Sequence, residues 1–525
     1  MLKWLGSLKT GNGGHPLAPP KELARVVGEL RTADSVKAVE EVTAWLEGVA
    51  GSDELKIGER FDIAKALDEA AAPHRAKTAR DYAATGRQSK FREQKSWALN
   101  FDLWRCLAAV YLDLMRRIDA SEKGFEALKP HAALLSARAL RAQTQLLKWL
   151  YIHYGPVDND IWIGFGAAYR FAETRKAQRQ SLVAYPATAA GETTPEQELL
   201  RGLLLCASSP DGLTQSELEV CERLIAHFAK AFSLSAKQEK ESTYWFDLSM
   251  GKAPMRLAAP PGELTNDLRL FSCAQGHAAV QALIGRIAQT QEVPREVDLA
   301  GMADVQAVLD VLQHLELMWA PLPPIRKSQR KRLQTRVSVV NKFETMLQLC
   351  STDTATTPQV DVDLDFGQTG VFGTVESWLV ENVSAGGFGA VIAHKDSDWL
   401  KVGRLILVQA TGMKNWELAL VRRLAREANG QSAVGVQVIA RMPITATFTS
   451  QAGFWNNGQP EMTGLFMPDA SEAGAVLLAL PYGMYNAGEQ VRTTVAGVGH
   501  VLFPIGTIER GDDFELLKFR DMVQQ

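Results

Sequence analysis

The stretch Ser377-Trp-Leu-Val-Glu-Asn-Val-Ser-Ala-Gly-Gly-Phe-Gly-Ala-Val391 decides the fold of the C-terminal part of this 525-residue chain. Two short apolar runs flank a centre of Asn, Ser and Gly, which are residues that turns favour. Similar short runs follow at 405–408, 418–421 and 434–439, and no helical pattern separates them. This spacing predicts a small antiparallel β-barrel rather than a parallel sheet.

The same layout returns further along the chain. In Thr463-Gly-Leu-Phe-Met-Pro-Asp-Ala-Ser-Glu-Ala-Gly-Ala-Val476, an Asp, a Ser and a Gly repeat the spacing of the Asn, Ser and Gly in the first stretch. They are Asp469, Ser471 and Gly474, against Asn382, Ser384 and Gly387. Residues 441–525 are therefore predicted to form a second, diverged barrel.

The first part of the chain has a different period. From about residue 20 to 320, apolar residues recur at intervals of three and four, as amphipathic helices require. Thr194-Pro-Glu-Gln197 has the form of a capping box with Pro at the first helical position. No steady repeat period accompanies the pattern, which predicts an irregular array of helical hairpins, with one short β-hairpin at 242–257.

Three prolines within residues 320–324 end the helical pattern, because Pro removes a backbone donor and biases its predecessor away from helical angles. The predicted fold is a multidomain α + β chain. Residues 1–320 form an all-α helical-hairpin domain that binds a partner, 321–440 a first barrel, and 441–525 a second. The polar segment 351–371 is expected to be a long loop or an extra strand.

The composition sets the broad class. With 57 Lys and Arg against 60 Asp and Glu and 46% hydrophobic residues, the chain is expected to be folded and soluble, without a global attraction to nucleic acid. Five scattered cysteines do not make a disulfide framework. The sequence contains neither a signal-like h-region nor an apolar run of about 18 residues, so we expect a cytoplasmic protein without a membrane span.

A dense basic cluster follows the prolines. Six cations and no acidic residue fall within 11 positions: Arg326, Lys327, Arg330, Lys331, Arg332 and Arg336. A charged linker, or an arm that binds nucleic acid weakly, is the ordinary interpretation of such a run. Its position just before the predicted barrel favours a specific anion-binding role.

The arginine pair and the turn together resemble the PilZ domain. In that family two arginines four residues apart precede the first barrel strand, here Arg332 and Arg336, and an Asp/Asn-x-Ser-x-x-Gly signature lies between two strands, here Asn382, Ser384 and Gly387. Val434-Gly-Val-Gln-Val438 resembles the closing strand. The resemblance covers residues 326–440, although the interval between the two motifs is longer than usual. It implies binding of the bacterial second messenger cyclic di-GMP.

The chemistry of this ligand suits the residue types. An Arg fork donates bidentately to a phosphate or to guanine O6 and N7, and it also stacks on a base. Adjacent glycines permit a close approach of the backbone. The predicted ligand-binding residues are Arg332, Arg336, Asn382, Ser384, Gly386 and Gly387, with Arg330 and Lys331 as additional candidates. The alternative for the turn is an ordinary strand connection.

Two other features are expected to be structural. Arg422 and Arg426 also stand four apart, but the residues before them have the pattern of a strand interior. In the second barrel, aligning Arg441 with Arg336 puts Gln437 where the first arginine should be, so half of the arginine pair is missing.

No catalytic or metal-binding pattern emerges. Asp361-Val-Asp-Leu-Asp365 resembles the start of a calcium loop, but Phe366 and Phe372 occupy positions that need Gly and Glu. The nine histidines show no metal-ligand spacing or triad order. We therefore expect a non-enzymatic receptor without cofactor or metal. It would bind cyclic di-GMP, change its domain arrangement and signal to a protein partner through the helical domain.

Two alternatives stay open. The chain could be a structural or adaptor protein whose helical array binds a partner and whose barrels have no ligand. It could also bind RNA through the basic arm, although no aromatic platform accompanies the charges.

Overall fold

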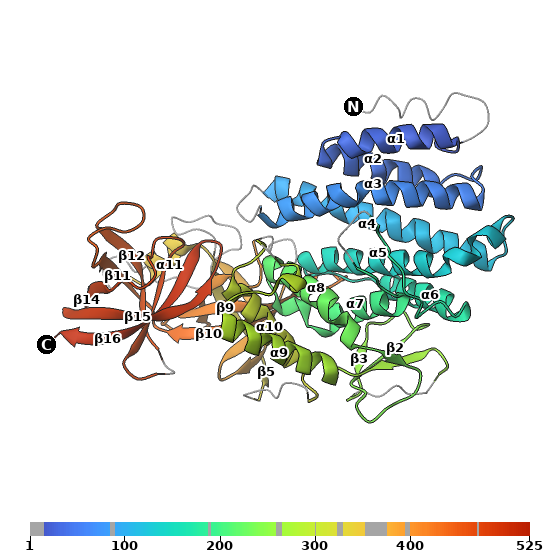
Figure 1. The fold of residues 1–525 in the computed structure, drawn as a ribbon. Coiled ribbons are helices and arrows are strands. Elements are labelled where there is room, and N and C mark those ends of the chain that lie inside the picture. Colours follow the sequence, from blue (N-terminus) through green and yellow to red (C-terminus); the bar gives the residue numbers. More distant parts are fainter. Residues whose placement is uncertain are drawn as a thin grey trace. The chain divides into compact units, whose positions relative to one another are not determined.

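The structure is a computed structural model, and it describes residues 15–84, 90–186, 191–258, 265–299, 301–322, 329–351, 375–393, 399–469 and 472–524. Internal contacts divide the chain into two units (Figure 1). The first comprises Met1–Pro210 and Gln215–Pro324, and the second comprises Asp211–Thr214 and Ile325–Gln525. The predicted organisation, a helical region followed by two closed barrels, is confirmed.

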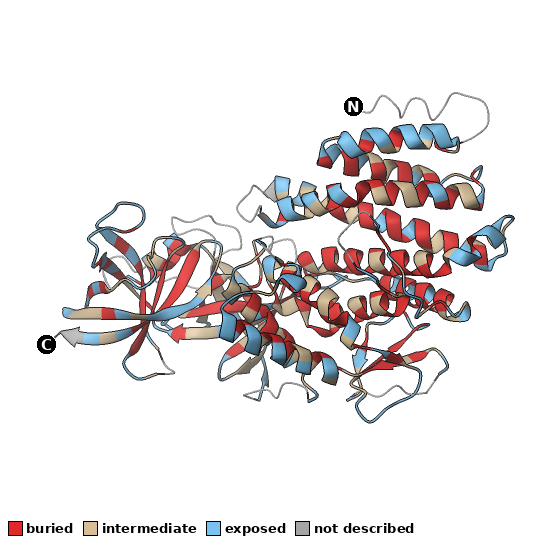
Figure 2. Ribbon diagram, in the orientation of Figure 1, coloured by how far each residue is buried: buried red, intermediate tan, exposed pale blue. Residues whose placement is uncertain are grey.

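The first unit is built mainly from α-helices, and Figure 1 shows α1 to α5 stacked in layers. Helix α5 packs against α4, α6 and α7. In Figure 2 α1 is largely exposed, whereas α5 is largely buried. The helices are α1 Pro20–Thr32, α2 Ser35–Ala50, α3 Ile57–Ala84, α4 Lys90–Asp119, α5 Ala132–Ile152, α6 Asn159–Thr174, α7 Pro195–Ala207, α8 Gln215–Phe228, α9 Ala274–Thr290 and α10 Val305–Trp319.

The capping box predicted from the sequence is present at the start of α7. The Gln197 backbone N–H donates to Thr194 Oγ1, and the Thr194 backbone N–H donates to Gln197 Oε1, both at 3.1 Å. Pro195 occupies the first helical position, where its missing N–H costs nothing. The helix therefore begins where the sequence indicates.

A small sheet lies within the helical unit. The expected hairpin is the pair β2 Tyr244–Asp247 and β3 Met255–Arg256. Strands β1 Leu234–Ser235 and β4 Leu268–Phe271 extend it to the order β1-β4-β2-β3. Trp245, Leu268 and Leu270 form a buried cluster on this sheet, which explains the aromatic and apolar content of these short segments.

Charged side chains are buried around α5. Asp68 is fully buried and accepts hydrogen bonds from the hydroxyls of Tyr111 at 2.7 Å and Tyr185 at 3.0 Å. It also pairs with Arg75. Burial by itself would raise the pKa of Asp68, but the charges of Arg75 and Arg138 hold it below its ordinary value. The carboxylate therefore stays ionised inside the helical unit.

Helices α5, α7 and α8 are linked by a second group of largely buried ion pairs. Arg141 Nε lies 2.6 Å from Glu198 Oε2, and Lys148 Nζ lies 2.8 Å from Glu219 Oε2. Arg201 pairs with Glu222 at 2.7 Å. Buried charges need such partners, because an unpaired one would carry a large desolvation cost.

The second unit contains the two barrels. The first closes in the order β10-β7-β6-β5-β8-β9, and every predicted strand segment falls inside one of its strands. The strands are β5 Lys331–Val340, β6 Glu376–Ser384, β7 Gly387–Ala393, β8 Leu405–Ala410, β9 Glu417–Arg426 and β10 Gln431–Arg441. The segment 351–371 lies outside the described residues except for Ser351.

The second barrel repeats the topology of the first. Counted from its own first strand, each barrel closes in the order one, two, three, six, five, four. The strands are β11 Ile444–Ser450, β12 Glu461–Pro468, β13 Ala475–Pro481, β14 Val491–Val495, β15 Val498–Arg510 and β16 Phe514–Gln524. The internal repeat seen in the sequence is therefore a repeat of the fold.

The two barrels share one hydrophobic core. Leu407 and Leu420 of the first barrel belong to the same buried cluster as Leu465 and Leu516 of the second. Helix α11, Phe343–Leu349, which the sequence did not predict, packs its buried Phe343 and Met346 into this cluster. The second barrel also has a buried cluster of its own, which includes Phe448 and Phe519, so the boundary near residue 441 crosses one shared cluster.

Candidate functional site

The predicted arginine and the predicted asparagine meet across two strands. Arg332 on β5 is the direct register partner of Asn382 on β6, and Lys331 is the partner of Val383. Both basic side chains are exposed. Strand pairing thus places a guanidinium beside the Asn-x-Ser-x-x-Gly turn, although the two motifs are far apart in the sequence.

The arginines do not precede the first strand, as the resemblance implied. Arg332 and Arg336 lie within β5, and Arg336 Nη1 donates to Ser377 Oγ at 3.3 Å. The register shifts between Arg332 and Thr335, so an extra residue interrupts the alternation of the strand. Residues four apart in a regular strand lie on one face, but this shift means that strand alternation alone does not place the two guanidinia on the same side. Arg326 and Lys327 lie outside the described residues, and Arg330 is the last residue before β5.

The turn itself is a tight connection between β6 and β7. Ser384 pairs with Gly387, and Ser384 Oγ donates to the Gly387 carbonyl oxygen at 3.1 Å. The Val438 N–H of β10 donates to the Gly386 carbonyl oxygen at 3.1 Å. Gly386 is exposed, with open space where a Cβ would stand. These bonds hold the turn firmly against β10.

Gly387 has a structural reason to lack a side chain. A Cβ at this position would lie 2.0 Å from the Val436 carbonyl oxygen of the neighbouring strand. No backbone atom can accept such a contact without moving the strand. The glycine is therefore required by strand packing, whereas the sequence analysis attributed it to close approach of a ligand.

Asn382 offers a free acceptor. Its Oδ1 is shielded from solvent and has no hydrogen-bond partner among the described residues. Its amide lies over Gly389, where a Cβ would come within 2.7 Å of Nδ2. A shielded oxygen without a partner is costly, and a donor from a bound molecule would satisfy it.

Arg422 is engaged in structure, in agreement with its predicted role. Its Nε donates to Gln437 Oε1 at 2.8 Å, and its Nη1 donates to Glu509 Oε2 of the second barrel at 2.6 Å. Gln437, which the sequence alignment assigned to the region before the second barrel, lies in β10 of the first.

The corresponding turn of the second barrel is filled by its own ion pairs. Lys518 Nζ lies 2.7 Å from Asp469 Oδ2 and 3.0 Å from Glu472 Oε2. Arg520 also pairs with Glu472, at 3.0 Å. Ser471 lies outside the described residues. Cations from β16 thus already occupy the acidic groups of this turn.

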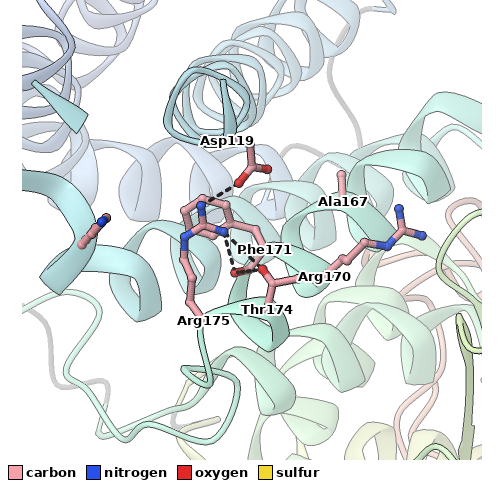
Figure 3. Close-up of a pocket in the computed structure, with 7 residues that line it drawn as sticks. Asp119, Ala167, Arg170, Phe171, Thr174 and Arg175 are labelled. Atoms are coloured by element: carbon pink, nitrogen blue, oxygen red, sulfur yellow. Dashed lines mark hydrogen bonds and ion pairs between the residues drawn. The ribbon is translucent and has the colours of Figure 1, made fainter. Parts of the chain in front are cut away.

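A pocket in the helical unit is another candidate. It has a volume of about 770 Å³ and is lined by Asp119, Lys129, Ala167, Arg170, Phe171, Thr174 and Arg175. Figure 3 shows Arg175 reaching Asp119, and the distance is 2.6 Å. Arg170 pairs with Asp267 at 3.0 Å and Lys129 with Glu126 at 2.7 Å. Since each cation already has a carboxylate partner, the pocket has no excess charge to attract an anion.

Metal binding and cysteine chemistry have little support in the described part of the chain. Residues 15–524, gaps excepted, contain no group of three or more His, Cys, Asp or Glu arranged to hold a metal ion. None of the five cysteines is in a disulfide, and burial raises the pKa of Cys106, Cys273 and Cys350 to about 12, so these three thiols are poor nucleophiles. Among the helices that the structure describes, none is both long and apolar enough to cross a bilayer.

The structure comprises a helical unit and two barrels of the same topology. On the first barrel, the exposed Arg332 lies beside the Asn-x-Ser-x-x-Gly turn of residues 382–387. The comparison with protein families adds an independent finding. Residues 21–239 match the family described as cyclic-di-GMP receptor FimW, N-terminal domain. The match falls in the helical region, to which the sequence analysis assigned no family; it ends before β2, α9 and α10, and it does not include the barrels. A comparison with curated proteins found no match.

Proposed function

We propose that this chain is a cyclic di-GMP receptor that binds the dinucleotide on the first barrel. The observation that carries the proposal is the register pairing of Arg332 with Asn382 beside the Ser384–Gly387 turn. The match of residues 21–239 to a domain of a cyclic di-GMP receptor supports the same ligand independently, because it rests on a different part of the chain.

Each residue of this face has a chemical role in the proposal. Arg332 and Arg336 donate to phosphate oxygens or to guanine O6 and N7, with Arg330 and Lys331 adding positive charge. Asn382 Oδ1, which lacks a partner in the described structure, accepts from the guanine N2 amino group. Ser384 and the exposed Gly386 form the edge against which the ligand lies, and Gly387 keeps the turn packed on β10.

The output in this proposal is an interaction, not a reaction. Ligand binding changes the domain arrangement of the chain, so that the helical unit presents a surface to a protein partner. The proposed receptor acts in the cytoplasm, where a bacterial second messenger is made, and requires neither cofactor nor metal.

The alternative is an adaptor whose helical unit binds a partner and whose barrels are structural. The filled turn of the second barrel favours a structural role for that barrel. The first barrel differs, because its arginine is exposed and its Asn382 oxygen is unpartnered among the described residues. An RNA-binding role for the basic segment is a weaker alternative.

Calorimetric titration of the full chain with cyclic di-GMP tests the proposal. We expect saturable binding that Arg332→Ala abolishes or weakens strongly. Arg520→Ala is the matched control, because Arg520 is an exposed arginine beside the corresponding turn of the second barrel, where it pairs with Glu472. Absence of binding at tens of micromolar ligand would favour the adaptor.

A further inference from the structure

We propose that Gln437 is the residue that selects guanine over adenine in the bound cyclic dinucleotide, and that Arg422 and Glu509 position it. This inference rests on the proposed function, since it concerns a ligand on the first barrel. Gln437 belongs to neither of the two sequence motifs.

The fold brings Gln437 next to the turn. It is the direct register partner of Gly387, which in turn pairs with Ser384, so three neighbouring strands carry these residues in one row. Adjacent strands lie about 4.8 Å apart, so Gln437 is one strand from Gly387 and two from Ser384. Its side chain is exposed, whereas the preceding Val436 is buried. A base that lies on the turn is therefore within reach of this amide.

Arg422 fixes which way the amide points. Its Nε donates to Gln437 Oε1 at 2.8 Å, and a guanidinium can only donate, so the atom that faces it must be the oxygen. The NH₂ group consequently points away from Arg422. No described residue accepts a hydrogen bond from it. Gln437 thus presents donors to a ligand and keeps its acceptor occupied.

An amide that presents only donors to the ligand discriminates between guanine and adenine. Guanine has acceptors at both O6 and N7, whereas adenine has a donor, the N6 amino group, in place of O6. A side chain that offers only donors matches the guanine edge and meets donor against donor on adenine. A free glutamine would rotate its amide and accept from adenine, but the bond to Arg422 opposes this rotation.

The second barrel contributes through Glu509. Arg422 is the extra residue of a β-bulge, since Gly435 pairs with Arg423 while Val436 pairs with Val421. Its Nη1 reaches Glu509 Oε2 at 2.6 Å, and its side chain is 37% exposed. Because Arg422 is the extra residue of the bulge, its side chain does not follow the alternation of the strand. The Glu509 carboxylate holds its guanidinium in place. Glu509 is therefore a positioning residue for Gln437, without contact to the ligand.

The test is the ratio of dissociation constants for cyclic di-AMP and cyclic di-GMP, measured by calorimetry on the full chain. Gln437→Glu keeps an acceptor for Arg422 but removes the donors, so we expect the ratio to fall about tenfold or more. Gln437→Ala, which adds no charge, should lower it too. Glu509→Gln should lower it severalfold, a change that loss of stability alone would not produce.

Gln431→Glu is the matched control, because Gln431 is an exposed glutamine at the other end of β10. It should leave the ratio unchanged. If Gln437→Glu and Gln437→Ala both keep the wild-type ratio while Arg332→Ala still abolishes binding, the site is correct and the role of Gln437 is wrong. If the wild-type chain binds neither dinucleotide, the proposed function itself fails. Thermal unfolding of each variant identifies any that do not fold.

Discussion

Arg332 and Asn382 lie directly opposite each other on neighbouring strands of the first barrel, and Asn382 Oδ1 has no hydrogen-bond partner among the described residues. A permanently charged donor group thus stands beside a shielded acceptor at one edge of a tight turn. An arrangement of this kind is suited to a ligand that carries both phosphates and hydrogen-bonding bases.

The arginines should dominate the affinity. Arg332→Ala and Arg336→Ala should each cost about 2–4 kcal/mol of binding free energy, because each removes a charge-assisted contact. Calorimetry with cyclic di-GMP measures the loss. Arg520→Ala should change the affinity little, and an equal loss in that variant would indicate a general charge effect rather than a site.

The two glycines of the turn should differ in how much their replacement lowers the melting temperature. Gly387→Ala should destabilise the barrel, because its Cβ would overlap the Val436 carbonyl oxygen. Gly386→Ala should leave the melting temperature nearly unchanged, since open space surrounds that position. Thermal unfolding followed by circular dichroism compares the two. If Gly387→Ala melts like the wild type, the close packing of β7 on β10 is wrong.

The segment before β5 should report on ligand binding. Trypsin should cleave the free protein within residues 326–330, ahead of the strand, and saturating cyclic di-GMP should slow this cleavage. Arg332 and Arg336 should resist cleavage in both states, because they are part of β5. If the ligand binds tightly and the rate at 326–330 does not change, the signal leaves through another surface.

The helical unit should lose stability in acid. Glu198 and Glu222 have pKa values of about 2 against an ordinary 4.5: burial alone would raise them, but Arg141 and Arg201 beside Glu198, and Arg201 and Lys148 beside Glu222, lower them. A depressed carboxylate pKa contributes stability above the unfolded value, and this contribution is lost as the pH falls. Urea unfolding should therefore show a decline between pH 4.5 and about 2.

Glu198→Gln provides the control for this effect. It should cost about 3–5 kcal/mol at neutral pH, because Arg141 is left buried without its partner. It should also flatten the decline in acid. An unchanged decline would assign the acid sensitivity to other carboxylates, such as Asp68.

The shared core predicts that the barrels are not separable. A chain that ends after Arg441 would expose Leu407 and Leu420, which pack in one cluster with Leu465 and Leu516. We expect such a chain to aggregate or to lose its sharp thermal transition. A soluble, cooperatively folding product would show that the first barrel is stable alone.

The sequence by itself determined the elements of this protein. Apolar periodicity identified the helices and strands, Thr194 and Gln197 marked a helix start, and the Asn/Ser/Gly spacing located both barrel turns. These features depend on neighbours close in the chain, so local pattern is sufficient to predict them. Helix α11 was not predicted from the sequence, because it is short and is buried against residues that are distant in the chain.

Only the tertiary structure decided which residues meet. Closure of the barrel puts β10 beside β7, which brings Gln437 to Gly387, and the bulges in β5 and β9 set where Arg332 and Arg422 lie. The contact of Arg422 with Glu509 further depends on how the two barrels pack against each other through a shared cluster. Cross-strand register follows from the pairing of distant segments and from single inserted residues, and neither leaves a periodic signal in the chain.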